Sequence, residues 1–542
     1  MAGFQGRTRL SAHMRAMFST HDEAARTGVP VEEIQGRRAA AAAEGASRRQ
    51  FLRGAAGGLA VAAAGGLGVR SLLQAPAANA ATAPRVVVVG AGLAGLRVAH
   101  DLYRRKGIAA TVYEGNTRAG GRCWSLRGFF DAGHVVEHGG AFINSDHTAA
   151  LNLAKTLGLK TNTVNGGNHG KYEDKYWIDG ALYSITDANN DWKVVQPKFA
   201  AELKAAPYPQ TYDNYTARGR QLDLMTVDEW LAANVPGGLG SRFAKLMQSN
   251  VLSEYGLDPS RQPALNLIYL LGWNSPGFLA PITGGDEKYS IVGGNDQLIS
   301  GMIGQLPPGT VQYGKKLTAL RSNADSTVTC TFSDGLAVSD VVADKVVLAL
   351  PFMTLRDCDL SGAGFSALKT RAIQQLDLGT NAKLHVQFTS RPWVAQKYGG
   401  VAYTNPDTLQ TVWDDSVGQA LPQGILCQFP SGSAVTTGWT GAAFGTAPAA
   451  QVNTFLSGME PIFPGVTAAY NGRAYRDVWH LNPWSKGAYT CPRVGQYTTL
   501  WGAQPGAEGN VHFAGEHTSL DNFGYLDGAI ASGERVSKEI AP

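Results

Sequence analysis

Three glycines and one acid near residue 90 have the spacing of a site for phosphate and ribose groups. Gly90, Gly92 and Gly95 follow four valines, and Glu114 comes 24 residues after the first of them. In such a turn the first glycine allows a sharp bend, the second leaves room for a diphosphate, and the third lets a helix approach the sheet closely. The open helix start attracts phosphate oxygens. Glu114 fits ribose hydroxyls, so the pattern predicts a dinucleotide site.

A βαβ unit must position these residues. The sequence predicts a buried strand over Val86–Val89, a helix that opens at Leu93 and Ala94, and a second strand over Ala110–Tyr113. Because the glycines follow a strand, open a helix and lead to an acid, they favour a dinucleotide site over a βαβ unit without a ligand. The motif leaves open whether the dinucleotide carries nicotinamide or flavin.

Most of the net charge lies in the first 80 residues. Residues 1–80 hold ten arginines, no lysine and five acids, a net charge of +5, whereas the whole chain of 542 residues carries +4. About −1 is left for residues 81–542, and this near-neutral balance argues against a nucleic-acid partner. The length allows more than one domain.

The first 80 residues resemble a twin-arginine signal peptide. Ser47–Arg53 contains the arginine pair, an apolar run over Gly54–Val69 follows, and Ala78–Ala80 fits a cleavage site. The run is too short and too rich in glycine for a stable membrane span. We expect export by the twin-arginine machinery to the periplasm or the medium, with an uncleaved anchor as the alternative. That machinery carries folded proteins, which suits a cofactor bound in the cytoplasm.

Residues for metal or hydrolytic chemistry do not stand out. None of the five cysteines forms a CxxC pair, and no His/Cys cluster has metal-ligand spacing, so we predict no metal. We expect the cysteines to be mostly core residues. They are Cys123, Cys330, Cys358, Cys427 and Cys491.

Hydrophobic periodicity predicts the remaining elements. Residues 145–280 are expected to be mostly helical. Tyr289–Leu306 is expected to form a strand, a glycine turn and a helix, and Lys383–Phe388 a half-buried strand. The other predictions are helices over Thr148–Leu157, Val227–Ala233, Gly240–Tyr255 and from about Leu526, and strands over Leu317–Arg321, Val328–Phe332 and Val346–Leu350.

Five further motifs lie between residues 118 and 516. They are Arg118-x-Gly120-Gly121-Arg122, Gly139-Gly140-Ala141-Phe142, Lys316–Leu320, Ala343–Pro351 and Phe513-Ala514-Gly515-Glu516. These motifs resemble those of the flavin-containing amine oxidases of the monoamine oxidase and L-amino-acid oxidase type. The resemblance covers most of residues 85–540 and implies FAD rather than NAD.

The resemblance also implies cofactor contacts for individual residues. Those expected at the flavin are Gly139, Gly140, Ala141 and Phe142 beside the isoalloxazine, Trp479 close by, and Leu526 at the start of a helix whose amides would stabilise negative charge. Those expected along the rest of FAD are Gly121 and Arg122 toward the diphosphate, Leu317 at the adenine, and Glu516 near the ribityl-diphosphate part.

The fold implied by the resemblance is α/β (α+β overall). A Rossmann-like FAD-binding domain of the glutathione-reductase-like type carries an inserted substrate-binding domain. The FAD-binding domain is expected to comprise residues 84–147, 285–355 and 475–542, and the substrate-binding domain residues 148–284 and 356–474.

Three residues are expected to carry the reaction. Lys383 resembles a family lysine that is bound through water to flavin N5, where it would hold the water and assist reoxidation by O2. The alternative is a lysine at a strand edge that reaches solvent. Tyr489 and Tyr525 resemble two aromatic residues that flank the substrate amine and polarise it, with ordinary core tyrosines as the alternative.

Two departures from the family pattern refine these expectations. Ala488 stands where some members have a cysteine linked to the flavin, which predicts non-covalent FAD. The stretch Gly139–Asp146 lacks the arginine that binds the carboxylate in L-amino-acid oxidases, although Arg242 or Arg261 offers an alternative.

The activity implied is oxidative deamination of a primary or secondary amine to an imine and then an aldehyde, with O2 reduced to H2O2. The alternatives are an L-amino-acid oxidase, a dehydrogenase of the same fold with another electron acceptor, and a flavoprotein with only a binding role. The sequence leaves the particular amine and the oligomeric state open.

Overall fold

The computed structural model describes residues 83–164, 173–279 and 286–542. The leader predicted for residues 1–80 therefore lies outside the described residues. Within the described ranges, no helix combines the length and the apolar character that crossing a membrane requires.

A five-stranded parallel sheet forms the predicted dinucleotide-binding half. Its strand order is β10-β2-β1-β14-β23. Because the chain continues from β1 to β2 on one side while β14 pairs on the other, the strand order reverses beside β1. Ligands of such sheets bind at this point, beyond the carboxyl ends of the strands. The strands are β1 (Val86–Val89), β2 (Ala110–Tyr113), β10 (Val311–Gln312), β14 (Lys345–Leu348) and β23 (Val511–Phe513).

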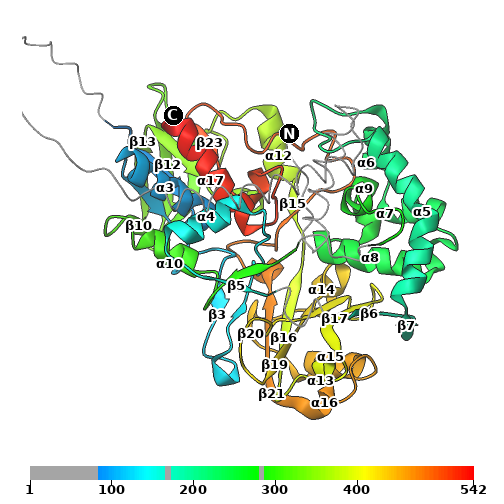
Figure 1. The fold of residues 1–542 in the computed structure, drawn as a ribbon. Helices are drawn as coiled ribbons and strands as arrows, with labels where there is room; N and C mark the ends of the chain where they lie inside the picture. Colours follow the sequence, from blue (N-terminus) through cyan, green and yellow to red (C-terminus); the bar gives the residue numbers. More distant parts are fainter. Residues whose placement is uncertain (1–82, 165–172, 280–285) are drawn as a thin grey trace, which may run out of the picture. The chain divides into compact units, whose positions relative to one another are not determined.

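Helices cover one face of this sheet. The predicted βαβ unit is confirmed, with α3 over Leu93–Lys106 between β1 and β2. Helix α17 (Leu526–Ile540) lies beside α3, although more than 400 residues separate them in the sequence (Figure 1). Helix α4 (Thr148–Thr156) also packs against α17 and thus joins this half of the molecule. Helix α10 (Gln297–Ile303) follows the short strand β9 (Tyr289–Ile291) in the chain and packs against α3, which completes the layer.

A three-stranded antiparallel sheet covers the opposite face. Strands β11 (Lys316–Ser322) and β12 (Val328–Ser333) occur where strands are predicted. Strand β13 (Val338–Ala343) was not expected, because it is an edge strand with largely exposed residues and no strong apolar pattern. The predicted strand Val346–Leu350 ends two residues early, at Leu348.

An eight-stranded sheet forms the core of the other half, in the order β20-β21-β16-β19-β18-β17-β6-β7. Figure 1 shows it below the five-stranded sheet in the view drawn. Its strands are β6 (Glu173–Ile178), β7 (Ala181–Tyr183), β16 (Ala382–Phe388), β17 (Tyr398–Thr404), β18 (Thr411–Asp414), β19 (Gly424–Phe429), β20 (Phe444–Thr446) and β21 (Tyr470–Val478).

Strand β16 is not half-buried, as its alternating pattern predicted, but buried at every residue. Its apolar side chains Leu384, Val386 and Phe388 face one core cluster. Its polar side chains alternate with them and are covered by residues 130–139 instead of water. For example, Gln387 accepts from the backbone N–H of Asp131. The prediction failed because alternation shows which residues share a face but not what covers that face.

Five helices pack beside this sheet, as expected for the mostly helical region. Thr226 and Glu229 form a complete capping box at the start of α7. Helix α8 begins two residues later than predicted, where Ser241 caps it. The helices are α5 (Ile185–Ala205), α6 (Ala217–Leu224), α7 (Val227–Asn234), α8 (Arg242–Tyr255) and α9 (Ala264–Leu271), and the region also contains β5 (Thr161–Thr163), β6 and β7.

Short elements connect these layers. The two-stranded pairs are β3 (Ser125–Leu126) with β4 (Val136–Glu137), β5 with β9, and β15 (Asp377–Leu378) with β22 (Thr490–Cys491). The remaining helices are α11 (Phe352–Leu355), α12 (Ala367–Gln375), α13 (Pro392–Ala395), α14 (Ser433–Gly438), α15 (Ala449–Met459) and α16 (Val466–Ala469).

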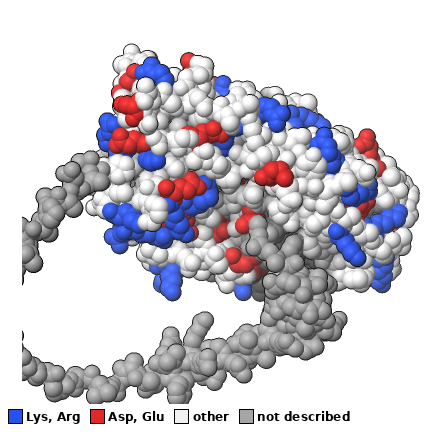
Figure 2. All heavy atoms as spheres, turned by 90° about the horizontal axis from the view of Figure 1, so that it is seen from above, with Lys and Arg blue, Asp and Glu red and all other residues white. Residues whose placement is uncertain are grey.

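The surface and the cysteines agree with an ordinary globular fold. On the face drawn in Figure 2, basic and acidic side chains are interspersed among uncharged ones. All five cysteines lie in the described ranges as free thiols, four of them buried and Cys358 partly exposed.

The glycine turn provides a test of this packing. A Cβ atom on Gly95 would lie 2.0 Å from the carbonyl oxygen of Gly90, whereas a Cβ atom on Gly92 would have no neighbour within 4 Å. We expect Gly95→Ala to lower the free energy of unfolding by about 2 kcal/mol or more, because α3 must move away from β1. Gly92→Ala is the matched control and should leave the stability of the ligand-free protein nearly unchanged. Thermal unfolding measures both, and equal losses would contradict this account.

Candidate active site

One pocket extends from the carboxyl ends of β1 and β2 to the eight-stranded sheet. Of the residues predicted to bind the cofactor or to carry the reaction, Gly95 alone does not line it, because its place is the contact between α3 and β1. The predicted residues that line the pocket are Gly90, Gly92, Leu93, Ala94, Glu114, Gly121, Arg122, Gly139, Gly140, Ala141, Phe142, Leu317, Lys383, Trp479, Tyr489, Glu516, Tyr525 and Leu526.

The end of the pocket at the glycine turn fits a dinucleotide. Gly90 has a φ of +105°, which other residues rarely adopt, and the open space at Gly92 leaves the backbone accessible. The carboxylate of Glu114 accepts from the backbone N–H groups of Ala91 and Asn116, each at 2.8 Å. Burial raises the pKa of Glu114, while these two donors oppose the shift. The carboxylate is therefore fixed in place with acceptor capacity left for a ribose.

Glu516 joins three segments at the middle of the pocket. Its carboxylate accepts from Arg122 Nη1 at 2.8 Å and from the hydroxyl of Thr490 at 3.0 Å. Its second oxygen accepts from the backbone N–H of Gly524, directly before Tyr525 and α17. Arg122 also donates to the carbonyl of Ala488 at 2.8 Å. One carboxylate thus fixes the arginine motif, the segment around residue 490 and the start of the last helix.

The start of α17 is open toward the pocket. Tyr525 is the N-cap residue and its side chain does not cap the helix, while Leu526 and Ala529 line the pocket. The backbone amides of the first turn and the helix dipole place partial positive charge there. The arrangement suits a group that carries negative charge.

Lys383 is buried at the opposite wall. Its side chain, in a residue 4% exposed, donates from Nζ to the carbonyls of Glu137 and Gly139, each at 2.8 Å. This burial in a central strand excludes the alternative of a lysine at a strand edge that reaches solvent. An ammonium group has three N–H donors, so two carbonyls leave one donor for a group in the pocket.

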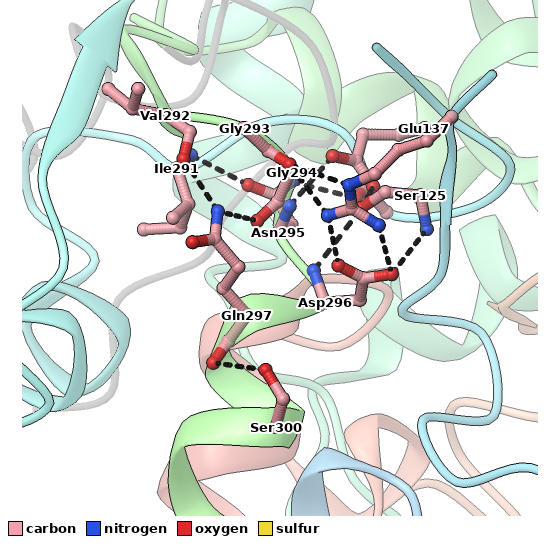
Figure 3. Close-up of polar contacts among 12 residues, drawn as sticks. Ser125, Glu137, Ile291, Val292, Gly293, Gly294, Asn295, Asp296, Gln297 and Ser300 are labelled. Carbon is pink, nitrogen blue, oxygen red and sulfur yellow. Dashed lines mark hydrogen bonds and ion pairs between the residues drawn. The ribbon is translucent and has the colours of Figure 1, made fainter.

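The carbonyl groups that hold Lys383 belong to a tightly anchored loop. The carboxylate of Glu137 accepts from Ser125 Oγ and from the backbone N–H of Asn295, both at 2.8 Å (Figure 3). Asn295 also donates from Nδ2 to the carbonyls of Gly140 and Ala141, at 3.0 and 2.9 Å. Burial raises the pKa of Glu137 to about 7. The sequence reasoning missed Ser125 and Asn295, although the glycine pair before Asn295 marked the turn.

Aromatic side chains line the pocket around Lys383. The hydroxyl of Tyr489 donates to the carbonyl of Ser253 at 2.8 Å. The ring of Tyr525 packs edge-on against His147, with 4.7 Å between centroids. The further aromatic and polar residues in the pocket lining include Tyr403, Trp413, Phe429, Ser253, Asn381 and Thr411, and Glu287 adds a carboxylate to the lining.

The arginines that line the pocket within the described residues are Arg118 and Arg122, both on the dinucleotide side. Arg242 and Arg261, the alternatives for a substrate carboxylate, are not among the lining residues. Instead, Arg242 donates to the carbonyl of Leu182.

A buried polar cluster lies behind Lys383 on the same face of β16. Donor atoms of His385, Asp415 and Cys427 lie within 4.8 Å of one another. Sequence spacing did not predict this cluster, because the three residues come from separate segments that meet only in the eight-stranded sheet.

A parallel sheet with a glycine turn, an acid positioned for a ribose and a long pocket at the carboxyl ends of its strands define a dinucleotide-binding protein. The chain belongs to the family of flavin containing amine oxidoreductases, whose model matches residues 93–541. It is therefore an FAD-dependent enzyme that acts on amines, and the cradle at Gly90 and Gly92, with Glu114 beside it, fits the dinucleotide part of that cofactor.

Individual relatives cover nearly the whole chain. A pseudooxynicotine dehydrogenase from a Pseudomonas species is 26% identical over 92% of this chain and 96% of its own. An L-amino-acid oxidase from Siganus canaliculatus is 25% identical over 85% of each chain. Among solved structures, cyclohexylamine oxidase from Brevibacterium oxydans IH-35A shares the fold, with a TM-score of 0.72 at 20% identity over 85% of this chain and 99% of its own.

Proposed function

We propose that this enzyme oxidatively deaminates a primary or secondary amine that carries no carboxylate, and that O2 is its electron acceptor. The observation that carries the proposal is the charge of the lining. Trp413 forms an aromatic wall beside Lys383, the pocket lining includes the carboxylate of Glu287, and the lining arginines of the described residues lie on the dinucleotide side. An amino acid would bring in a carboxylate for which the described part of the pocket offers no arginine outside the dinucleotide side.

The proposed reaction balances as follows. The CH–NH unit loses two electrons and two protons and becomes an imine, O2 takes them up as H2O2, and water hydrolyses the imine to a carbonyl compound and ammonia or a primary amine. Bound FAD supplies the redox chemistry of the first two steps. The chain supplies binding, orientation and the exclusion of water.

Tyr489 and Tyr525 are proposed to orient the amine. Both rings line the pocket, and the hydrogen bond from Tyr489 to the carbonyl of Ser253 fixes one of them. Ring faces attract the partial positive charge of N–H and C–H groups next to nitrogen. The rings also exclude water from the reacting carbon.

A screen for peroxide formation tests the proposal. We expect H2O2 to form in step with the loss of a simple amine, and L-amino acids to react far more slowly. The L-amino-acid oxidase and the dehydrogenase among the relatives represent the two competing outcomes. Turnover of L-amino acids but of no amine would reject the preference for amines. Amine loss without O2 consumption, supported by an artificial electron acceptor, would reject O2 as the acceptor.

Lys383 is proposed to hold a water at the flavin with its remaining donor and to assist reoxidation by O2. We expect Lys383→Met to retain FAD but to slow reoxidation by O2 about 100-fold or more, within the usual range for loss of a positioned polar group. Lys369→Met is the matched control, since Lys369 is also buried and donates to a backbone carbonyl, that of Gln504, away from the pocket. Stopped-flow mixing with O2 gives both rates, and unchanged reoxidation would remove Lys383 from this role.

Non-covalent attachment of FAD is proposed from Ala488. This residue lines the pocket and carries no nucleophile, and its carbonyl accepts from Arg122. We expect acid precipitation to release all of the flavin into the supernatant. Flavin that stays in the protein band after denaturing electrophoresis would contradict the proposal.

A further inference from the structure

His385 lies between two buried carboxylates on the polar face of β16. Its Nδ1 is 3.1 Å from Asp415 Oδ2, and its Nε2 is 3.4 Å from Asp477 Oδ2. The side chains of His385 and Asp477 are fully buried, and that of Asp415 is 8% exposed. Such an arrangement is costly unless the charges balance.

The charges balance when His385 is an imidazolium. Asp415 and Asp477 are two negative charges, and Lys383, two residues along the same strand face, supplies one positive charge. Burial acts to lower the pKa of His385, but Cys427, Asp415 and Asp477 outweigh it and raise that pKa well above its usual value. Burial raises the pKa of Cys427.

Asp477, His385 and Asp415 form an ion triplet, which connects on one side to the loop that holds Lys383. The other oxygen of Asp477 accepts from His138 Nδ1 at 2.5 Å. The His138 ring stacks on Trp124, with 3.6 Å between centroids. The backbone carbonyl of His138 accepts from Trp479 Nε1 at 2.8 Å. The next residue, Gly139, provides one of the carbonyls that bind Lys383.

On the other side the triplet connects to an aromatic wall of the pocket. Trp413 Nε1 donates to Asp415 Oδ1 at 3.1 Å. The ring of Trp413 lines the pocket, and its centroid is 5.9 Å from Lys383 Nζ. A continuous series of contacts therefore runs behind Lys383. It leads from His138 through Asp477, His385 and Asp415 to Trp413, and so links the Gly139 loop to the Trp413 wall.

We infer that His385 is a positioning residue for the flavin site. Its imidazolium, held between Asp477 and Asp415, fixes the loop at Gly139 and the wall at Trp413 and keeps a compensated positive charge behind Lys383. The inference rests on the proposed role of Lys383 at the flavin. It does not depend on which amine is the substrate.

The reduction potential of bound FAD tests the inference without any amine. The holoenzyme is equilibrated with a reference dye at neutral and alkaline pH. We expect His385→Gln to shift the potential to lower values, because two buried carboxylates then face a single cation and oppose the negative charge of the reduced flavin. Gln387→Leu is the matched control on the same buried face of β16. It loses hydrogen bonds with Asp131 and Asn471 but should leave the potential unchanged.

A double variant separates charge from mere packing. His385→Gln combined with Asp415→Asn removes one charge of each sign, and we expect the potential to return toward that of the unaltered enzyme. An unchanged potential in His385→Gln, or an equal shift in Gln387→Leu, would overturn the inference. One equivalent of a transition metal in the purified holoenzyme would also overturn it. A failed amine screen with the expected potential shifts would instead count against the proposed function alone.

Discussion

The ammonium group of Lys383 needs oxygen partners because it is buried in the middle of an eight-stranded sheet. It finds them in the carbonyls of Glu137 and Gly139, both 2.8 Å away. A buried cation without such partners would cost several kcal/mol, so this contact constrains how the loop of the dinucleotide-binding half lies on strand β16. The pocket follows from that constraint, since its two ends belong to the two halves that this contact joins.

Carbonyl groups can hold a cation only if the loop that carries them is itself fixed. Glu137 achieves this with its side chain, which accepts from Ser125 and Asn295, while Asn295 binds the carbonyls of Gly140 and Ala141. The backbone beside the expected flavin position is thus determined by hydrogen bonds to residues 12 and more than 150 positions away. This preorganisation lets a small set of polar atoms serve a mostly apolar pocket.

The sequence predicted best what depends on neighbouring residues. Strand β1, the turn at Gly90 and helix α3 follow from local pattern, as does the capping of α7 by Thr226. The resemblance gathered residues from distant segments that do line one pocket. What it missed depends on contacts between strands. The burial of the polar face of β16, and the meeting of His385 with Asp415, require a sheet and a covering loop that no local pattern encodes.

The balance of charge among Lys383, His385 and the two carboxylates behind them affects which substrates the pocket would suit. Lys383 lies beside the aromatic wall at Trp413, but two carbonyls already bind its ammonium group, and Asp415 and Asp477 balance the charges of Lys383 and His385. A substrate carboxylate would therefore gain little from Lys383 and would meet Glu287 on the wall. A protonated amine would gain little from Asp415 and Asp477, since His385 and Lys383 already compensate them. A neutral amine loses the least hydration on entering, and the neutral amine is the form whose nitrogen lone pair can assist cleavage of the adjacent C–H bond.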